Sequence, residues 1–296
     1  MPFSSPVVLD IDGSCGYLPG EQRLQLRNWQ ERLRYSCRKS DLDALQAQVG
    51  EGLLRQSGPF FLGSGDFHHL SLPIIAAHAR TRLLDVVVLD NHPDNMRFPF
   101  AIHCGSWVRQ VAALPGVRRV HVVGIHSQDI AWPHFWENNW WPLYSGRVHY
   151  WSVQVDVRYV RCLGLSQMFH GFNEIDALLD ALKAQLEPDF PLYLSIDKDV
   201  LAAEAVRTNW DQGMMQLPQM YAFVAACRTR LTGCDVTGDI SFYQYQQLLK
   251  RLLSRLDGQE TQEVPPALKD WQLQQHQVNL QLCRLLASTV PEARLD

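Results

Sequence analysis

Two short stretches of the sequence place metal-binding side chains at alternate positions, each directly after an apolar run. Asp90, His92 and Asp94 follow the first run, and Asp197 and Asp199 follow the second. Because successive side chains of an extended strand point to opposite faces, we expect each set to share one face. Converging carboxylates repel one another at neutral pH, whereas a divalent ion coordinates them. The spacing therefore predicts a metal site.

A further ligand lies upstream, where a glycine-rich turn at residues 63–66 leads to His68 at the start of a helical pattern. A turn that follows a strand delivers its side chains to the same edge of a sheet as the acidic motifs. With His68 the set contains two histidines and four aspartates. That set suits two oxygen-preferring divalent ions that share carboxylates and a bridging hydroxide. The adjacent His69 remains open as the alternative ligand.

Apolar runs typical of buried strands alternate along the chain with amphipathic helical patterns. We expect strands at residues 6–10, 60–62, 83–90, 117–124, 147–151, 192–197 and 231–236. We expect helices at residues 21–38, 41–55, 72–81, 107–114, 173–185, 217–230, 242–256 and 267–287. This alternation predicts an α/β fold of three layers, α/β/α, with a central, mostly parallel sheet. Both acidic motifs lie at the carboxyl ends of predicted strands, which is where ligands bind in such sheets.

The chain has 296 residues, of which 46% are hydrophobic, and this is ample for one large α/β domain. We expect a metal-hydrolase domain at residues 1–257, followed at residues 258–296 by a polar linker and a C-terminal helical extension. The pattern of the last helix predicts that it docks on an apolar surface. The sequence does not choose that surface.

The charge balance argues against a polyanionic partner. The formal net charge is −4, so neither nucleic acid nor an acidic membrane surface is attracted in general. A small-molecule substrate is the expected partner, and a homo-oligomer is left open. The start of the chain lacks a secretory signal, and no apolar run reaches the ~20 residues that a membrane helix needs. We therefore expect a cytoplasmic protein.

The order of the motifs resembles the arginase/agmatinase (ureohydrolase) family. Members of that family carry a GGDH turn, then DAHxD, then SxDxD, and here the matching residues are GDFH at 65–68, DNHPD at 90–94 and SIDKD at 195–199. Anchoring the first motif on the later Pro73 makes His68 the ligand instead of His69. The resemblance implies an arginase-like fold and two manganese ions. One ion would be held by His68, Asp90, Asp94 and Asp197, and the other by Asp90, His92, Asp94, Asp197 and Asp199.

The resemblance also implies two catalytic residues. Residues 101–105 are similar to a segment in which arginases carry a histidine proposed to shuttle protons. His103 would then protonate the departing nitrogen, for which the ordinary imidazole pKa of ~6.5 is suitable. Asp94 would accept the proton of the nucleophile transiently while it remains a bridging ligand.

The sequence departs from the family pattern at three positions that bear on the substrate. Members that cleave guanidino compounds usually carry a glutamate in a segment like EVNP, and the matching region, residues 233–241, has none. Asp239, or less favourably Asp235, would substitute with a shorter side chain. Asn91 replaces a small residue, and His126 replaces an arginine. The predicted function is accordingly a hydrolase of a non-peptide C–N bond in a guanidino, ureido or amide compound.

Other functions remain open at this level. A divergent member could keep the site as a catalytically silent metal-binding or regulatory protein, since the guanidinium-binding glutamate is missing. Asp10 and Asp12 lie in a DxDG[ST] pattern that resembles the nucleophile motif of haloacid-dehalogenase-like phosphatases. That family also needs a downstream acidic pair, and Tyr243 stands at the position of its second acid. A first strand that ends in a polar turn explains Asp10 and Asp12 better.

Overall fold

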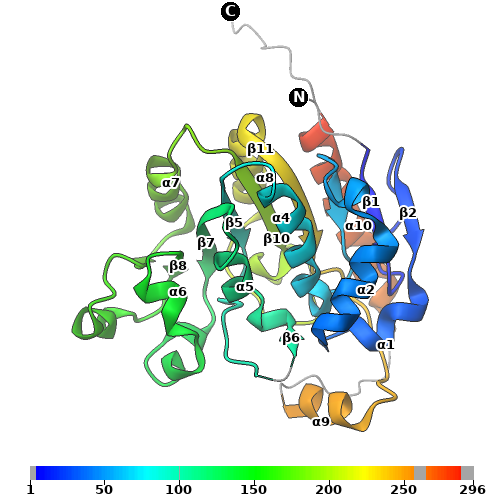
Figure 1. Cartoon of the computed structure of the whole chain (residues 1–296), viewed down its shortest axis with the longest axis horizontal. Helices are drawn as coiled ribbons and strands as arrows, with labels where there is room; N and C mark the ends of the chain where they lie inside the picture. The colour runs from blue at the N-terminus through cyan, green and yellow to red at the C-terminus, as the bar shows by residue number, and fades with distance from the viewer. Residues whose placement is uncertain (1–4, 100, 257–264, 288–296) are drawn as a thin grey trace, which may run out of the picture.

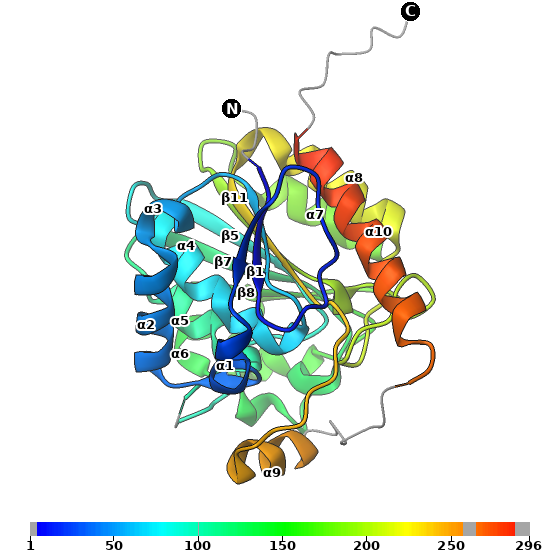
Figure 2. The same cartoon turned by 90° about the vertical axis from the view of Figure 1, so that its right-hand side faces the viewer.

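The nine strands of the central sheet all run in the same direction. The computed structural model describes residues 5–99, 101–256 and 265–287. Within these ranges the strand order is β2-β1-β4-β11-β10-β5-β7-β8-β9, and every neighbouring pair is parallel. Figure 1 and Figure 2 show helices on both sides of this sheet. The three-layer α/β/α architecture predicted from the sequence is therefore confirmed.

Most strands lie where the apolar runs predict them. In sheet order they are β2 (Gln22–Gln25), β1 (Val7–Asp10), β4 (Pro59–Phe61), β11 (Leu231–Thr237), β10 (Leu192–Asp197), β5 (Leu84–Leu89), β7 (Val117–Ile125), β8 (Val148–Val153) and β9 (Phe169–Phe172). In this sheet the sequence patterns miss the two edge strands, β2 and β9, and they also miss the separate pair of two-residue strands at Ser36–Cys37 and Ile102–His103. Each edge strand has four residues and is partly exposed, so it lacks the continuous apolar run of a buried parallel strand.

Helices cover the two faces of the sheet in two groups. On one face lie α1 (Gln30–Leu33), α2 (Lys39–Val49), α3 (Glu51–Leu54), α4 (Ser71–Ala79), α5 (Val108–Ala112) and α6 (Trp140–Tyr144). On the other lie α7 (Ile175–Gln185), α8 (Leu217–Cys227) and α10 (Leu268–Ala287). Figure 2 shows the sheet between these two groups, with α9 (Leu248–Leu256) at one end of the molecule.

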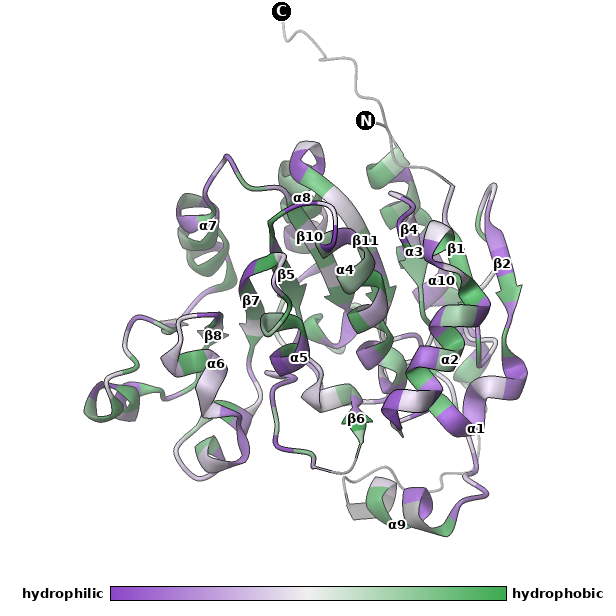
Figure 3. Cartoon of the chain, in the orientation of Figure 1, coloured by the Kyte–Doolittle hydropathy of each residue, from purple (hydrophilic) through white to green (hydrophobic). Residues whose placement is uncertain are grey.

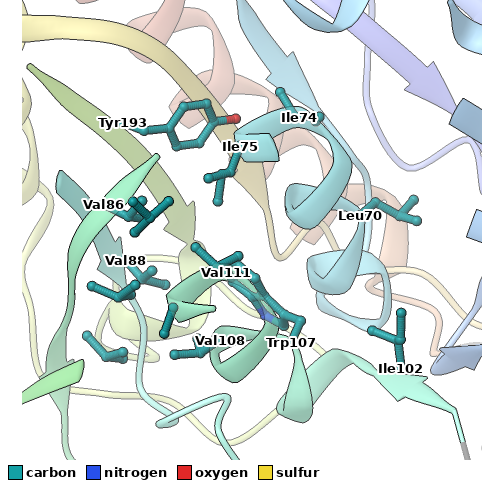
Figure 4. Close-up of a cluster of buried hydrophobic side chains, with 14 of the residues drawn as sticks. Leu70, Ile74, Ile75, Val86, Val88, Ile102, Trp107, Val108, Val111 and Tyr193 are labelled. Atoms are coloured by element: carbon teal, nitrogen blue, oxygen red, sulfur yellow. The ribbon is translucent and has the colours of Figure 1, made fainter. Parts of the chain in front are cut away.

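Alternating residues of each central strand build the two halves of the core. In β5, Val86 and Val88 pack in the first half, whereas Val87 and Leu89 pack in the second. Figure 3 shows the central strands coloured mostly as hydrophobic, as expected for a parallel sheet that is buried on both faces. Figure 4 shows part of the first half, in which Trp107 and its neighbours lie beside the β5 valines. This packing supports the chain segments that leave the carboxyl ends of the strands.

The helix predicted at residues 21–38 is wrong. Gln22–Gln25 instead forms β2, which pairs in parallel with β1 and places Arg23 within 3.4 Å of the Asp10 carboxylate. A 3₁₀ turn at Arg27–Trp29 and the short α1 follow, and then β3 (Ser36–Cys37) pairs with β6 (Ile102–His103). Backbone pairing with a neighbouring strand overrides local helix propensity here.

The helix predicted at residues 41–55 is divided in two. Gly50 separates α2 from α3 and has a φ of +84°, a conformation that side chains other than glycine rarely adopt. The remaining predicted helices are present, although α5 is shorter than expected and the helix predicted at residues 242–256 begins only at Leu248.

The C-terminal helix α10 packs against the second half of the core. Val278, Leu282 and Leu286 contribute to that half, and Gln275 Nε2 donates to the backbone oxygen of Gly238 at 2.9 Å. The docking surface that the sequence left open is therefore the face of the sheet that α8 also covers. Residues 257–264 of the expected linker lie outside the described residues, so the domain division at residue 257 stays a prediction. Among the described helices, none combines the length and apolarity needed to cross a bilayer.

Candidate metal centre

The carboxyl ends of neighbouring central strands bring the six predicted ligands to one cavity. His68 lies on the 3₁₀ helix η2 (Gly65–Leu70), which follows β4, and Asp90, His92 and Asp94 follow β5. Asp197 is the last residue of β10, and Asp199 lies on η7 (Lys198–Val200). All six side chains line the same cavity of about 370 Å³. The parallel sheet places them together because its strands share one carboxyl edge.

The first group of ligand atoms surrounds His68. Its Nδ1 atom lies 2.9 Å from Asp94 Oδ2, 3.2 Å from Asp90 Oδ2 and 3.4 Å from Asp197 Oδ2. All four side chains are buried. The His68 nitrogen and the carboxylate oxygens of Asp90 and Asp94 lie close enough together to contact one ion, and Asp197 adds a third carboxylate beside His68.

The second group surrounds His92. Its Nδ1 atom lies 3.0 Å from Asp199 Oδ2 and 3.7 Å from Asp90 Oδ1. Asp90 therefore offers one oxygen to each group, because its Oδ2 atom faces His68. A carboxylate shared in this way is the bridging arrangement expected of two adjacent ions.

The electrostatics of the two groups favour cations. Burial, followed by the charge of Asp90, raises the pKa of Asp94 to about 7, and the same two causes raise the pKa of Asp199 to about 7. Burial and the charge of Asp199 raise the pKa of Asp197 well above its usual range. The buried Asp90 Oδ2 atom accepts no well-aligned hydrogen bond from the described residues. The residues present thus fit divalent ions, which would compensate this excess of negative charge.

The ligands converge through tight turns and not through the two-residue period of a strand. Strand β5 ends at Leu89, and Asp90 Oδ1 accepts a hydrogen bond from the backbone N–H of His92 at 2.7 Å. Asp94 has a φ of +46°, in the left-handed region. Asp197 Oδ1 likewise accepts from the backbone N–H of Asp199 at 3.0 Å. The expectation that each set shares a strand face is therefore wrong in its geometry, because carboxylates that accept from their own backbone turn the chain out of the strand.

Buried partners hold His68 from behind. Its Nε2 atom lies 3.0 Å from Ser195 Oγ, and Ser195 Oγ donates to Asp235 Oδ1 at 2.7 Å. Tyr193 Oη donates to Asp235 Oδ2 at 2.7 Å. Asp235 therefore supports a ligand and does not line the cavity. Ligand histidines characteristically have such a partner on the second ring nitrogen.

The neighbouring His69 belongs to neither ligand group. Its ring is fully buried, and burial lowers its pKa well below the usual range. Of the two histidines, only His68 lies against the carboxylates, which favours His68 as the ligand.

His103 lines the cavity without belonging to either ligand group. Its Nδ1 atom accepts a hydrogen bond from the backbone N–H of Gly105 at 2.9 Å, so the ring proton of the neutral form is on Nε2. The ring packs edge-on against Tyr35 and stacks on Phe98. Burial lowers the pKa of His103 to about 4. The predicted proton-transfer role of His103 stays a prediction.

Asp239 is engaged elsewhere. Its Oδ1 atom accepts a hydrogen bond from Lys198 Nζ at 2.6 Å, and both side chains are buried. Asn279 of α10 donates to the same carboxylate at 3.2 Å. Asp239 is not among the residues that line the cavity. The structure thus gives this carboxylate partners within the protein and places it outside the cavity wall.

The two aspartates of the phosphatase-like pattern also lie away from the cavity. Asp10 lies within 3.4 Å of Arg23 and 3.1 Å of Arg27. Asp12 Oδ2 accepts from the backbone N–H of Ser64 at 3.1 Å, so it supports the turn that leads to the first ligand. Neither carboxylate lines the cavity.

The cavity wall contains residues that the sequence patterns did not single out. They are Asp129, His134, Glu137, Asn138, Trp210 and Asp211. The first four follow β7, and the position of that strand beside β5 was a signal that could have found them. Trp210 and Asp211 lie in a segment without strand or helix signals, so only the folded chain reveals them.

Comparisons with known proteins agree with this geometry. The model of the Arginase family matches residues 28–238. An uncharacterized protein from Thermotoga maritima is 29% identical over 205 residues, covering 68% of this chain and 67% of its own length. The structure of arginase from Bacillus subtilis superimposes with a TM-score of 0.57 at 12% identity, covering 97% of this chain and 99% of that one.

A hypothetical agmatinase from Burkholderia thailandensis superimposes with a TM-score of 0.50 at 18% identity, covering 83% of this chain. This chain spans 64% of the length of that protein. At these identities the two superpositions describe the fold alone, whereas the family model matches well over half of the sequence. The chain belongs to the arginase family.

Proposed function

We propose that the protein is a binuclear metal-dependent hydrolase that cleaves a non-peptide C–N bond in a guanidino, ureido or amide compound. The observation that carries this proposal is the sharing of Asp90 between the two ligand groups, around His68 and His92. Carboxylate oxygens with one imidazole in each group suit manganese, the metal that the family resemblance implies. His68, Asp90, Asp94 and Asp197 would hold one ion, and Asp90, His92 and Asp199 the other, to which the family resemblance adds Asp94 and Asp197.

Divalent ions held by these residues would lower the pKa of a bound water and so supply a hydroxide nucleophile near neutral pH. The chain itself moves the protons. Asp94 takes up the proton of the nucleophile while it remains in the first ligand group. His103 returns a proton to the departing nitrogen. The proton that it returns is the one taken up by Asp94, so the transfer balances, and the depressed pKa of about 4 makes the protonated His103 ring a ready donor.

The charge of the cavity restricts the substrate. Besides the ligands, the carboxylates of Asp129, Glu137 and Asp211 line its wall. They favour a neutral or positively charged molecule with hydrogen-bond donors and oppose a phosphomonoester dianion. Because Asp239 is paired with Lys198, a guanidinium group would need recognition from this wall and not from the segment after β11.

The test is metal analysis followed by a substrate screen. Protein purified without chelators and loaded with Mn²⁺ should bind two ions and release ammonia, urea or an amine from a guanidino, ureido or amide compound. The Asp197→Ala variant should lose this activity. If the loaded protein binds both ions but cleaves no such compound, the silent metal-binding function replaces the hydrolase. Phosphomonoester hydrolysis that Asp10→Asn abolishes would instead support the phosphatase.

A further inference from the structure

A carboxylate outside the predicted ligand set contacts His92. Asp211 Oδ1 lies 2.7 Å from His92 Nε2, on the side of the ring opposite the two aspartates of the second group. Asp211 belongs to the segment between η7 and α8, which none of the motifs includes. This contact lies at the exposed side of the cavity, because the Asp211 side chain is 69% exposed and that of His92 only 16%.

Asn91 holds Asp211 in this orientation. Its Nδ2 atom donates to the backbone oxygen and to Oδ2 of Asp211, both at 3.1 Å, which leaves Oδ1 directed at His92. The backbone N–H of Asn91 donates to Asp199 Oδ1 at 3.0 Å. Asn91 replaces the small residue of the family pattern, and this departure now has a structural reason. The longer side chain ties the segment that carries Asp211 to the second ligand group.

The segment on both sides of Asp211 is also fixed. Trp210 Nε1 donates to Asp66 Oδ1 at 3.2 Å, and the backbone N–H of Gly213 donates to the backbone oxygen of Asp199 at 2.7 Å. Gly213 approaches the chain so closely that an added Cβ atom would lie 2.5 Å from the backbone oxygen of Val200. An exposed aspartate held by such contacts has a defined position relative to the His92 ring.

We propose that Asp211 is a positioning residue for His92 and sets the affinity of the second metal ion. His92 Nδ1 faces Asp199 and Asp90, so this nitrogen must present its lone pair to an ion. The ring proton is then on Nε2, which donates to Asp211. A carboxylate on the second nitrogen fixes both the tautomer and the ring orientation of a ligand histidine and increases its basicity. The inference rests on the metal centre of the proposed function.

The two ligand histidines differ in this respect. The second nitrogen of His68 contacts the buried Ser195, whereas that of His92 contacts an exposed carboxylate from a separate segment. Removing Asp211 therefore changes the support of one ligand group and leaves the other intact. This difference makes the inference testable without any substrate.

The experiment is a calorimetric titration of metal-free protein with Mn²⁺. In Asp211→Ala we expect about 10- to 100-fold weaker binding of one ion and an unchanged affinity for the other. Asp211→Asn keeps an acceptor oxygen of the same shape and should restore most of the affinity. Glu137→Gln is the matched control, because it removes a negative charge from the same cavity wall without contacting His92. Its two affinities should remain close to those of the unaltered protein.

Three results would overturn the inference. The first is an Asp211→Ala variant that binds both ions like the unaltered protein. The second is equal weakening in Asp211→Ala and Glu137→Gln, which would assign the effect to general charge. The third is weakening of both ions together with a lower unfolding midpoint in Asp211→Ala and Asp211→Asn alike, which would assign Asp211 a role in folding. If the unaltered protein fails to bind a pair of ions, the proposed metal centre fails instead.

Discussion

Lys198 Nζ donates a hydrogen bond to Asp239 Oδ1 at 2.6 Å, and the two side chains are 0% and 2% exposed. This ion pair joins the chain just beyond the carboxyl ends of β10 and β11, which are neighbouring parallel strands. Asn279 extends the pair to α10 by accepting from Lys198 and donating to Asp239. The residue that the sequence suggested as a substrate binder is thus part of the internal support of the site.

Asp239→Ala should lower the free energy of unfolding by about 3–5 kcal/mol, because it leaves Lys198 charged, buried and unpaired. Urea unfolding measures the change. Asp180→Ala is the control, since Asp180 forms an exposed pair with Lys183 and its removal should cost less than about 1 kcal/mol. A stable Asp239→Ala protein with a raised KM would instead restore the substrate-binding prediction.

Asp197→Ala should remove at least one of the two metal ions while the domain stays folded. Asp197 lies at the end of β10, beyond the apolar residues that form the core, and it crowds other carboxylates. In the metal-free state the variant should therefore be as stable as the unaltered protein or more stable. Elemental analysis measures the metal content, and circular dichroism measures the folding and stability of the metal-free variant. Unchanged metal content contradicts the ligand role of Asp197.

His103→Ala should lower turnover by about 10²–10⁴-fold with both ions retained, because a proton-transfer group contributes in this range. The measurement is steady-state hydrolysis of whichever substrate the screen identifies, together with metal content. His134→Gln is a matched control, since His134 also lines the cavity but pairs with Glu137. If His103→Ala retains turnover within a few fold, His103 is only a packing residue of the wall.

Stability should fall with acid partly through a histidine cluster remote from the cavity. His149 Nδ1, on β8, lies 3.3 Å from His170 Nε2, on β9. The His170 ring stacks on Trp151 with ring centroids 4.1 Å apart. Burial, followed by the proximity of His149, lowers the pKa of His170 to about 4. In the unfolded chain a histidine has a pKa of ~6.5, so between about pH 4 and pH 6.5 the unfolded chain binds more protons than the folded chain. The contribution of neutral His170 to the free energy of unfolding is therefore complete above about pH 6.5 and is lost as the pH falls toward 4.

His170→Phe keeps the stacking but does not titrate. Between pH 7 and pH 4.5 it should lose about 1 kcal/mol less stability than the unaltered protein, a value reduced for the partial exposure of His170. Urea unfolding at several pH values gives the comparison. Parallel pH profiles for the two proteins would show that His170 does not contribute.

The sequence by itself determined the interior of the fold and the set of candidate ligands. Continuous apolar runs such as that of β5 are buried on both faces, so composition alone identifies the central strands. The alternation of strands and helices predicts a parallel sheet, and parallel strands end at the same edge. The sequence therefore predicted that Asp90 and Asp197 would lie close together. The edge strands were beyond reach because β2 is partly exposed, and its local pattern favours a helix until β1 pairs with it.

The tertiary structure decided how the ligands face one another and what surrounds them. The positive φ of Asp94 and the backbone turns at Asp90 and Asp197 depend on contacts between strands, and no two-residue period describes them. Asp211 contacts His92 although more than a hundred residues separate them in the sequence. Lys198 pairs with Asp239, and Asn279 of α10 packs against both. Local patterns report how a side chain relates to its own element. The distant partners of a charged side chain are decided only when the elements pack together.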